Sequence, residues 1–150
     1  MSALVESWNI NSRINTYLLD SLSDEQLDSK LEKGRTPRAQ FAHVHNVRLM
    51  WLKSADPALL EGLRKLENDA PKDVILAAMG LSSQAISTLI EKAIEGDQRV
   101  KGFKPHATAY VGYLISHESH HRGQLEIMLR LAGKPISDKV SFGLWEWGTR

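Results

Sequence analysis

The chain has 150 residues, of which 42% are hydrophobic and 25% are charged, a composition typical of a globular protein rather than a disordered one. Its formal net charge is +1, from 19 basic and 18 acidic residues, and no basic run stands out, so we expect no nucleic-acid partner. The absence of cysteine excludes disulfides, thiolate zinc sites and a cysteine nucleophile.

The sequence carries no sign of export or membrane insertion. Its N-terminal segment lacks a cationic start followed by a long apolar core, which argues against a signal peptide. The wholly apolar runs fall far short of the ~20 residues that span a bilayer. We therefore expect one domain over residues 1–150, cytoplasmic, with no membrane partner.

The first half of the chain predicts two long helices with a short turn between them. Apolar residues recur at helical spacing over residues 2–19, and Ser23 is a candidate N-cap for the turn over residues 24–27. The second long helix runs from Pro37 to about Ser54. Its start is well specified, because the preceding threonine can cap free amides and proline lacks an N–H where none is needed.

Two further helices are predicted in the second half. The third covers about residues 71–95, with Gly96 as its C-cap, and the fourth covers about residues 105–132. Gly133 predicts a left-handed cap for the fourth helix, followed by a proline stop. Since no alternating strands are found, the fold class expected is all-α, a four-helix bundle. The aromatic segment 141–147 is expected to dock on it.

Two histidines lie one turn apart on the fourth helix. His117 and His121 fall on an apolar stripe, and residues four apart on a helix share a face. This spacing lets two imidazoles reach one metal ion about 2.1 Å away. The stripe comprises Tyr110, Leu114, His117, His121, Gln124, Leu125 and Met128.

Other residues of this helix have accessory or structural interpretations. Gln124 lies on the ligand stripe and can orient a ligand or bind a substrate, whereas His120 projects to the edge of the stripe. Glu118 points about 100° away from the histidine before it and is expected to be solvated or to support the ligands from behind. Tyr110 offers the nearest hydroxyl, with a core tyrosine as the simpler interpretation.

A third ligand must come from another helix, and the second helix offers two candidates. His43 and His45 are about 200° apart around that helix, so only one of them can face the site. Periodicity slightly favours His45, which falls between Phe41 and Leu52, and leaves the choice open.

These segments resemble the DinB/YfiT-like metalloprotein superfamily. The resemblance rests on Ala42-His43 followed by Trp51-Leu52, on the H-x-x-x-H-R-G-Q pattern over residues 117–124, and on the helix order. It implies a four-helix bundle that holds a divalent metal at one end, with His43, His117 and His121 as ligands, and often a homodimer. It thus favours His43 over His45. Arg48 is a departure, because members of the family often carry an acidic residue there.

Three imidazoles leave coordination positions for water or substrate. We expect zinc first, although imidazole also suits nickel and iron. Some members of the superfamily resemble thiol transferases or isomerases, so the resemblance implies a metal-dependent enzyme, thiol transferase-like or hydrolase-like, that acts on a small molecule with an external low-molecular-weight thiol. One alternative is a non-catalytic, metal-stapled bundle or a stress-linked binding module.

Residues 117–121 also spell H-E-x-x-H, the zinc-protease pattern, in which Glu118 would polarise the attacking water. The chain predicts no sheet to support an extended peptide, and the R-G-Q continuation matches the other family better. A metallopeptidase is therefore the minor alternative.

Overall fold

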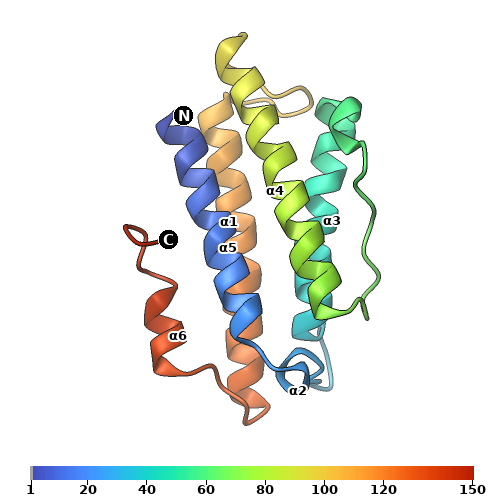
Figure 1. Ribbon diagram of the computed structural model, residues 1–150, viewed down its shortest axis with the longest axis vertical. Coiled ribbons are helices and arrows are strands. Elements are labelled where there is room, and N and C mark those ends of the chain that lie inside the picture. Colours follow the sequence, from blue (N-terminus) through green and yellow to red (C-terminus); the bar gives the residue numbers. More distant parts are fainter. Residues whose placement is uncertain (1) are drawn as a thin grey trace.

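The computed structural model describes residues 2–150, and within them the chain forms helices and no named strands (Figure 1). The four long helices agree closely with the sequence prediction. They are α1 (Ala3–Ser21), α3 (Pro37–Ala55), α4 (Lys72–Glu95) and α5 (Ala107–Leu131). Three short elements accompany them: α2 (Asp24–Leu27), the 3-10 turn η1 (Pro57–Leu60) and α6 (Asp138–Gly143).

The predicted caps are present. Ser23 accepts a hydrogen bond from the amide of Gln26, whose side chain returns one to the Ser23 amide, which completes a capping box. Thr36 accepts from the amide of Ala39 at the start of α3. At the far end of α5, Gly133 adopts the left-handed conformation with φ +74°, as predicted. Local chemistry therefore sets most helix boundaries.

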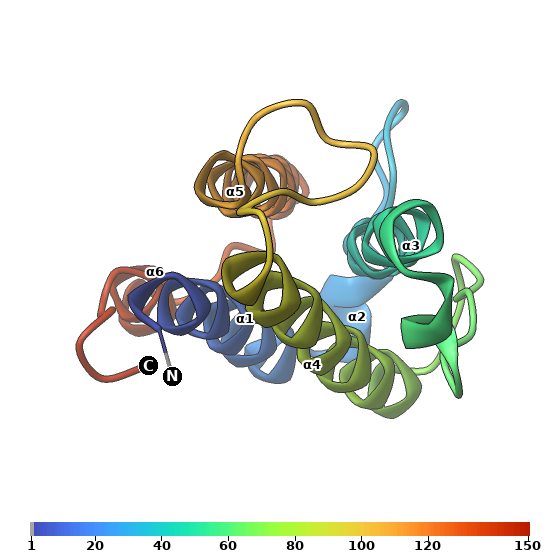
Figure 2. The same cartoon turned by 90° about the horizontal axis from the view of Figure 1, so that it is seen from above.

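The four long helices pack in the ring order α1, α4, α3, α5, so each contacts two neighbours along the ring. Figure 1 shows α3 and α4 running in one direction and α1 and α5 in the other, and Figure 2 shows the bundle from above. Since α3 and α4 are parallel, the chain between them returns along the length of the bundle. Five of the six histidines lie within the antiparallel neighbours α3 and α5, and the sixth, His106, is the N-cap of α5.

The core consists of two apolar clusters with a polar layer between them. One cluster contains Leu18, Leu27, Phe41 and residues near them, and the other contains Trp8 and residues near it. Along each long helix the buried residues change from one cluster to the other through buried polar residues. These are Asn11, Asn15, His45, Arg48, Ser82, Ser83, Glu118 and His121. Such a layer is stable only if its polar groups are hydrogen-bonded.

The C-terminal segment docks on α1, but not through its tryptophans. Leu144 is buried in the cluster that contains Leu18 and Phe41, and the guanidinium carbon of Arg150 lies 3.7 Å from the centre of the Tyr17 ring. Trp145 is 81% exposed and Trp147 is 38% exposed. The expected docking of the segment 141–147 is thus made through Leu144, whereas the Trp145 side chain lies in solvent.

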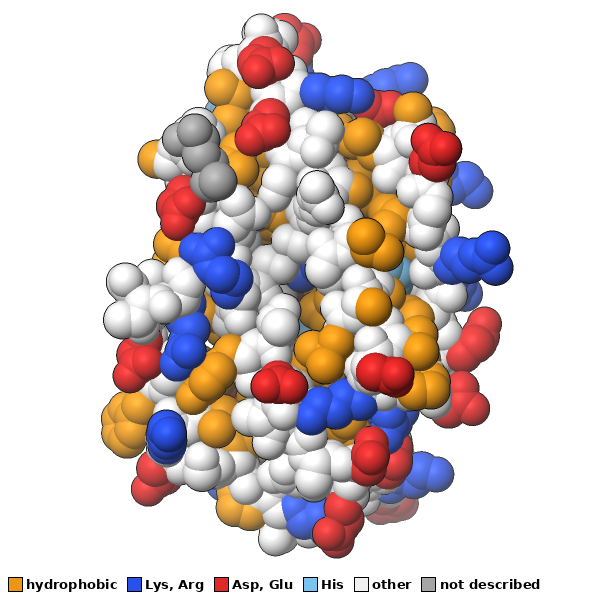
Figure 3. Space-filling view, in the orientation of Figure 1, with side chains coloured by type: hydrophobic (Ala, Val, Ile, Leu, Met, Phe, Trp, Pro, Cys, Tyr) orange, Lys and Arg blue, Asp and Glu red, His pale blue; other side chains and the backbone are white. Residues whose placement is uncertain are grey.

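On the face formed by α1 and α4, acidic and basic side chains are interspersed (Figure 3). Among the described residues, α4 is the one helix long and apolar enough to suit a membrane span, with mean hydropathy 1.4. Length and composition alone do not separate such a span from a core helix. Here α4 packs against both α1 and α3, as a core helix does.

Candidate metal centre

Three histidines from two helices meet on the outer side of the α3–α5 interface. His43 comes from α3, and His117 and His121 come from successive turns of α5. One ring nitrogen from each lies within 4.8 Å of the other two, which is the arrangement of a group that can hold a metal ion. The Nε2 atoms of His117 and His121 are 3.1 Å apart. Two nitrogens bound to one tetrahedral zinc lie about 3.3 Å apart, so this pair needs little movement.

Gln40 fixes the tautomer of His121. Its Oε1 is 2.6 Å from His121 Nδ1, and since an amide oxygen only accepts, that nitrogen carries the proton. The lone pair of His121 is therefore on Nε2, which faces His117. Gln40 is itself held by donating from its Nε2 to the Oε1 of Gln124 at 3.3 Å. A hydrogen bond of this kind to the far nitrogen is how metal-binding histidines are oriented.

The surroundings keep the three rings neutral. Burial lowers the pKa of His121 to about 4, and the neighbouring His117 and His43 add to the effect. Burial is also the main cause of the lowered pKa of His43 and of His117. Because a metal competes with protons for the same lone pairs, neutral rings favour coordination near neutral pH.

The set of donors fits a divalent cation. Because its Nδ1 carries the proton, the Nε2 atom of His121 can only accept a hydrogen bond or bind a cation. The short distance between the Nε2 atoms of His121 and His117 therefore requires either a proton on His117 Nε2 or a cation bound to both atoms. His117 Nδ1 is also buried without a hydrogen-bond partner in the described structure. Three neutral imidazoles that converge on one point are a donor set that could hold a divalent metal ion.

His45 has a different environment. It is completely buried and its ring nitrogens contact the Ser82 hydroxyl at 3.1 Å and the Arg64 carbonyl oxygen at 2.8 Å. Burial lowers its pKa, so the ring is neutral. The slight preference of periodicity for His45 was wrong. Residues on more than one face of α3 are buried, so the apolar pattern of this helix does not identify which face contacts α5.

Glu118 lies in the polar layer and not in solvent. Its Oε1 accepts from Arg48 Nε at 2.7 Å, and its Oε2 accepts from Arg48 Nη2 at 3.0 Å. The two side chains are 1% and 0% exposed. The expectation of a solvated carboxylate was wrong, since the turn of about 100° from His117 directs Glu118 into the bundle, where the guanidinium compensates its charge.

Residues of α1 complete the contacts of this carboxylate. Asn11 and Asn15 both donate to Glu118 Oε2, at 2.7 and 2.6 Å, and both accept from Arg122 Nη1, at 2.9 and 2.6 Å. Arg48 also donates to the Met79 carbonyl oxygen. We call Asn11, Asn15, Arg48, Glu118 and Arg122 the buried network. It ties α1, α3, α4 and α5 together directly beneath the histidines.

The family model of the DinB family matches residues 1–141. The chain belongs to the DinB family. Neither a curated protein nor a solved structure matches it. In this DinB-family chain, the departure at Arg48 is accommodated by Glu118 on the facing helix.

The resemblance had implied a site at one end of the bundle. In this DinB-family chain, the histidine cluster lies instead near the middle of α5. His120 is exposed, with its ring centre 5.3 Å from that of His121. Gln124 is exposed but contacts Gln40. Tyr110 is fully buried against Trp51 and Phe103, and burial raises its pKa, so it is a core tyrosine.

The H-E-x-x-H match does not describe a peptidase site. The peptidase glutamate must face the metal-bound water, whereas both oxygens of Glu118 are occupied by Arg48 and α1. Gln40, which sequence reasoning missed, is the residue that supports the ligands. Its position three residues before His43, on the same side of α3, is the signal that marks it.

Two cavities near the DinB-family histidines differ greatly in size. The space behind His121 has a volume of about 10 Å³, which is too small for a substrate. On the outer side, a groove of about 410 Å³ borders Gln40 and Gln124. Of these two cavities, the outer groove is the one with room for a small molecule.

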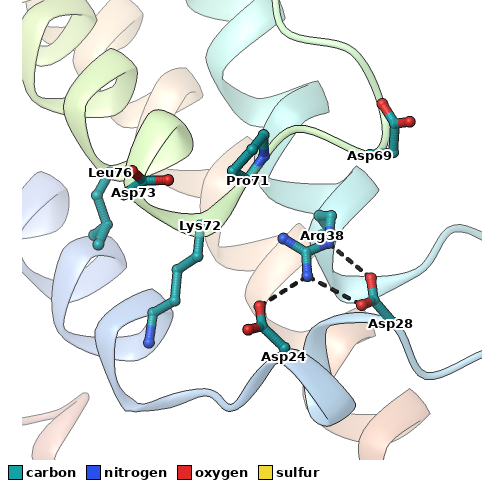
Figure 4. Close-up of a pocket in the computed structure, with 8 residues that line it drawn as sticks. All are labelled: Asp24, Asp28, Arg38, Asp69, Pro71, Lys72, Asp73 and Leu76. Atoms are coloured by element: carbon teal, nitrogen blue, oxygen red, sulfur yellow. Dashed lines mark hydrogen bonds and ion pairs between the residues drawn. The ribbon is translucent and has the colours of Figure 1, made fainter.

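A larger cavity, of about 590 Å³, lies elsewhere, at the junction of α2, α3 and α4 (Figure 4). Arg38 there donates to Asp24 and Asp28, at 3.0 and 2.7 Å, and Lys72 donates to carbonyl oxygens at the end of α1. The hydrogen bond from Arg38 is the main cause of the lowered pKa of Asp28. The contacts of Arg38 and Lys72 hold α2, α3, α4 and the end of α1 together at this junction.

Proposed function

We propose that the chain binds a divalent metal, zinc first and nickel or iron next, through His43, His117 and His121, and that it is a metal-dependent enzyme acting on a small molecule. The observation that carries the proposal is the convergence of three neutral imidazole nitrogens within 4.8 Å, with the tautomer of His121 fixed by Gln40. Membership of the DinB family supports the same assignment.

A bound zinc ion would lower the pKa of a coordinated water or thiol and thereby supply a nucleophile at neutral pH. The chain has no cysteine, so a thiol would come from a small molecule. The protein's own contribution is to orient the ligands: Gln40 holds the His121 ring, and the buried network holds α3 against α5. Three ligands leave the fourth position for water, thiol or substrate.

Zinc titration by calorimetry, with elemental analysis of the purified protein, tests the site. We expect one zinc per chain, and loss of at least about a hundredfold in affinity for His43→Asn, His117→Asn and His121→Asn, since each removes one of three ligands. His120→Asn is the matched control, because His120 is exposed beside the ligands and makes no hydrogen bond to them. Equal zinc binding by the control and the three variants would contradict the proposal.

Cobalt substitution separates an enzyme from a metal-stapled bundle. Co²⁺ in the site should give visible absorption bands that change when 2-mercaptoethanol is added, with a thiolate-to-cobalt charge-transfer band in the near ultraviolet. Such a band requires an accessible coordination position. A spectrum that is indifferent to thiol, water and anions, together with a large loss of stability on chelation, would favour the staple.

A further inference from the structure

A groove begins at Gln40, the residue whose side chain contacts His121. It has a volume of about 410 Å³ and lies between the α2–α3 connection and the second half of α5. At one end are Gln40, which contacts His121, and Gln124, which contacts Gln40. The groove therefore begins one hydrogen bond away from a proposed metal ligand.

The lining of the groove is both apolar and cationic. Leu31, Ile127 and Leu131 are 36%, 57% and 69% exposed, which is unusual for three large apolar side chains on one small surface. Lys33 and Arg35 are the charged residues of the lining.

No acidic residue lines the groove among residues 2–150, and Glu32, which separates Leu31 from Lys33, does not line it. Among residues 2–150, the side chains of Lys33 and Arg35 form no ion pair and no hydrogen bond. The charges of the lining are thus uncompensated, and an anion would complement them. Arg35 is also close enough to the cluster to contribute to the lowered pKa of His43 and His121.

We propose that this groove is the substrate subsite of the metal centre and binds a small amphipathic carboxylate, with the carboxylate on Lys33 and Arg35 and the apolar chain against α5. The inference rests on the proposed metal function, since a subsite requires a reactive centre beside it. The volume suits a molecule with a short apolar chain, and the apolar surface on α5 accounts for binding energy that a simple anion would not gain.

Calorimetric titration of the zinc-loaded protein with octanoate tests the subsite, with octan-1-ol and acetate as probes that lack the carboxylate or the chain. We expect octanoate to bind at least about tenfold more tightly than either. The double variant Lys33→Gln/Arg35→Gln should weaken octanoate binding about tenfold and leave octan-1-ol unchanged. Lys65→Gln, an exposed lysine outside the groove, is the control and should behave as the wild type.

Proximity to the metal has its own readout. In the cobalt-substituted protein, the proton resonances of bound octanoate should show enhanced relaxation, which disappears when the His121→Asn variant is mixed with Co²⁺ or when the double variant is used. Ile127→Gln should weaken octanoate but not acetate, because it removes apolar surface alone. These shifts would support a carboxylate subsite beside the metal.

The outcomes that overturn the subsite differ from those that overturn the metal site. If zinc binds but the double variant binds octanoate like the wild type, the groove proposal is wrong and the metal proposal stands. If zinc does not bind, the proposed function fails, and octanoate binding that is lost in the double variant still supports the groove as a carboxylate site. A dimer that Ile127→Gln dissociates, without octanoate binding, would show that a second copy covers this face.

Discussion

Two polar clusters lie at the interface of α3 and α5, one of them completed by asparagines of α1, and they differ in whether their groups are satisfied. In the buried network, the Glu118 carboxylate accepts two bonds from Arg48 and two from α1, so the charges of Glu118 and Arg48 compensate each other. In the histidine cluster, two Nε2 atoms face each other and a buried Nδ1 has no partner within the described residues. The Glu118 carboxylate is fully hydrogen-bonded within the first cluster, whereas the Nε2 atoms of the second are placed so that they could share a cation.

The difference teaches how to tell a structural polar cluster from a functional one in a bundle. Glu118 and His117 are adjacent in sequence, and both belong to the same five-residue motif. Their roles diverge because successive residues of a helix are rotated by about 100°. This rotation places Glu118 in the core and His117 on the outer side of the α3–α5 interface. Breaking the two clusters should therefore have different consequences, stability in one case and metal binding in the other.

The largest effect is expected from the buried network. Glu118→Ala should lower the free energy of unfolding by about 3–5 kcal/mol, because it leaves the Arg48 guanidinium buried without its counter-charge. Urea denaturation followed by circular dichroism measures it. Glu91→Ala, at an exposed position of α4, should stay within about 0.5 kcal/mol of the wild type. The double variant Arg48→Met/Glu118→Leu should lose less free energy of unfolding than Glu118→Ala, because it removes both charges. A greater loss in the double variant would show that the unpaired charge is not the cause.

The next effect concerns the metal. Zinc at a hundredfold excess over its dissociation constant should raise the free energy of unfolding by about 2.7 kcal/mol, since it binds the folded state alone. Chelation should reverse the gain. His121→Asn should show no response to zinc, whereas His120→Asn should respond like the wild type. A response in both variants would assign the stabilisation to another site.

Acidification of the chelated protein should reveal the neutral state of the cluster. The folded pKa of His121 is about 4, well below the value of about 6.5 for an unfolded chain. Between these values the unfolded state binds more protons, so stability falls as the pH is lowered through this window and levels off below it. The expected loss is about 2 kcal/mol between pH 7.5 and 5. In His121→Asn the pH dependence should be smaller by this amount, and an unchanged slope would contradict it.

The smallest effect is expected from the residue behind the ligands. Gln40→Ala should weaken zinc binding about tenfold, or about 1.4 kcal/mol, because His121 loses the bond that fixes its tautomer and orientation. Gln84→Ala, at an exposed position of α4, is the matched control. Zinc affinity equal to the control would show that the ring is held by packing alone.

Much of the fold was determined by local sequence. The Thr36-Pro37 start of α3, the Ser23 capping box and the left-handed Gly133 after α5 fix helix ends through bonds within a few residues. The spacing of His117 and His121 likewise determines that they share a face, because it depends only on helix geometry. Caps and residue spacings of this kind can be predicted without knowing which helix packs alongside.

Tertiary structure decided what lies across the interfaces. The pattern of α3 slightly favoured His45 over His43, since this helix is buried on more than one side, and only its packing against α5 brings His43 to the cluster. The inward turn of Glu118 depends on Arg48, 70 residues away in sequence. Gln40 was overlooked because a glutamine gains its role from the ring it contacts, 81 residues away. Local sequence therefore determined the helices and the pairing of His117 with His121 on one face, and the packing of α3 on α5 selected the third histidine of the cluster.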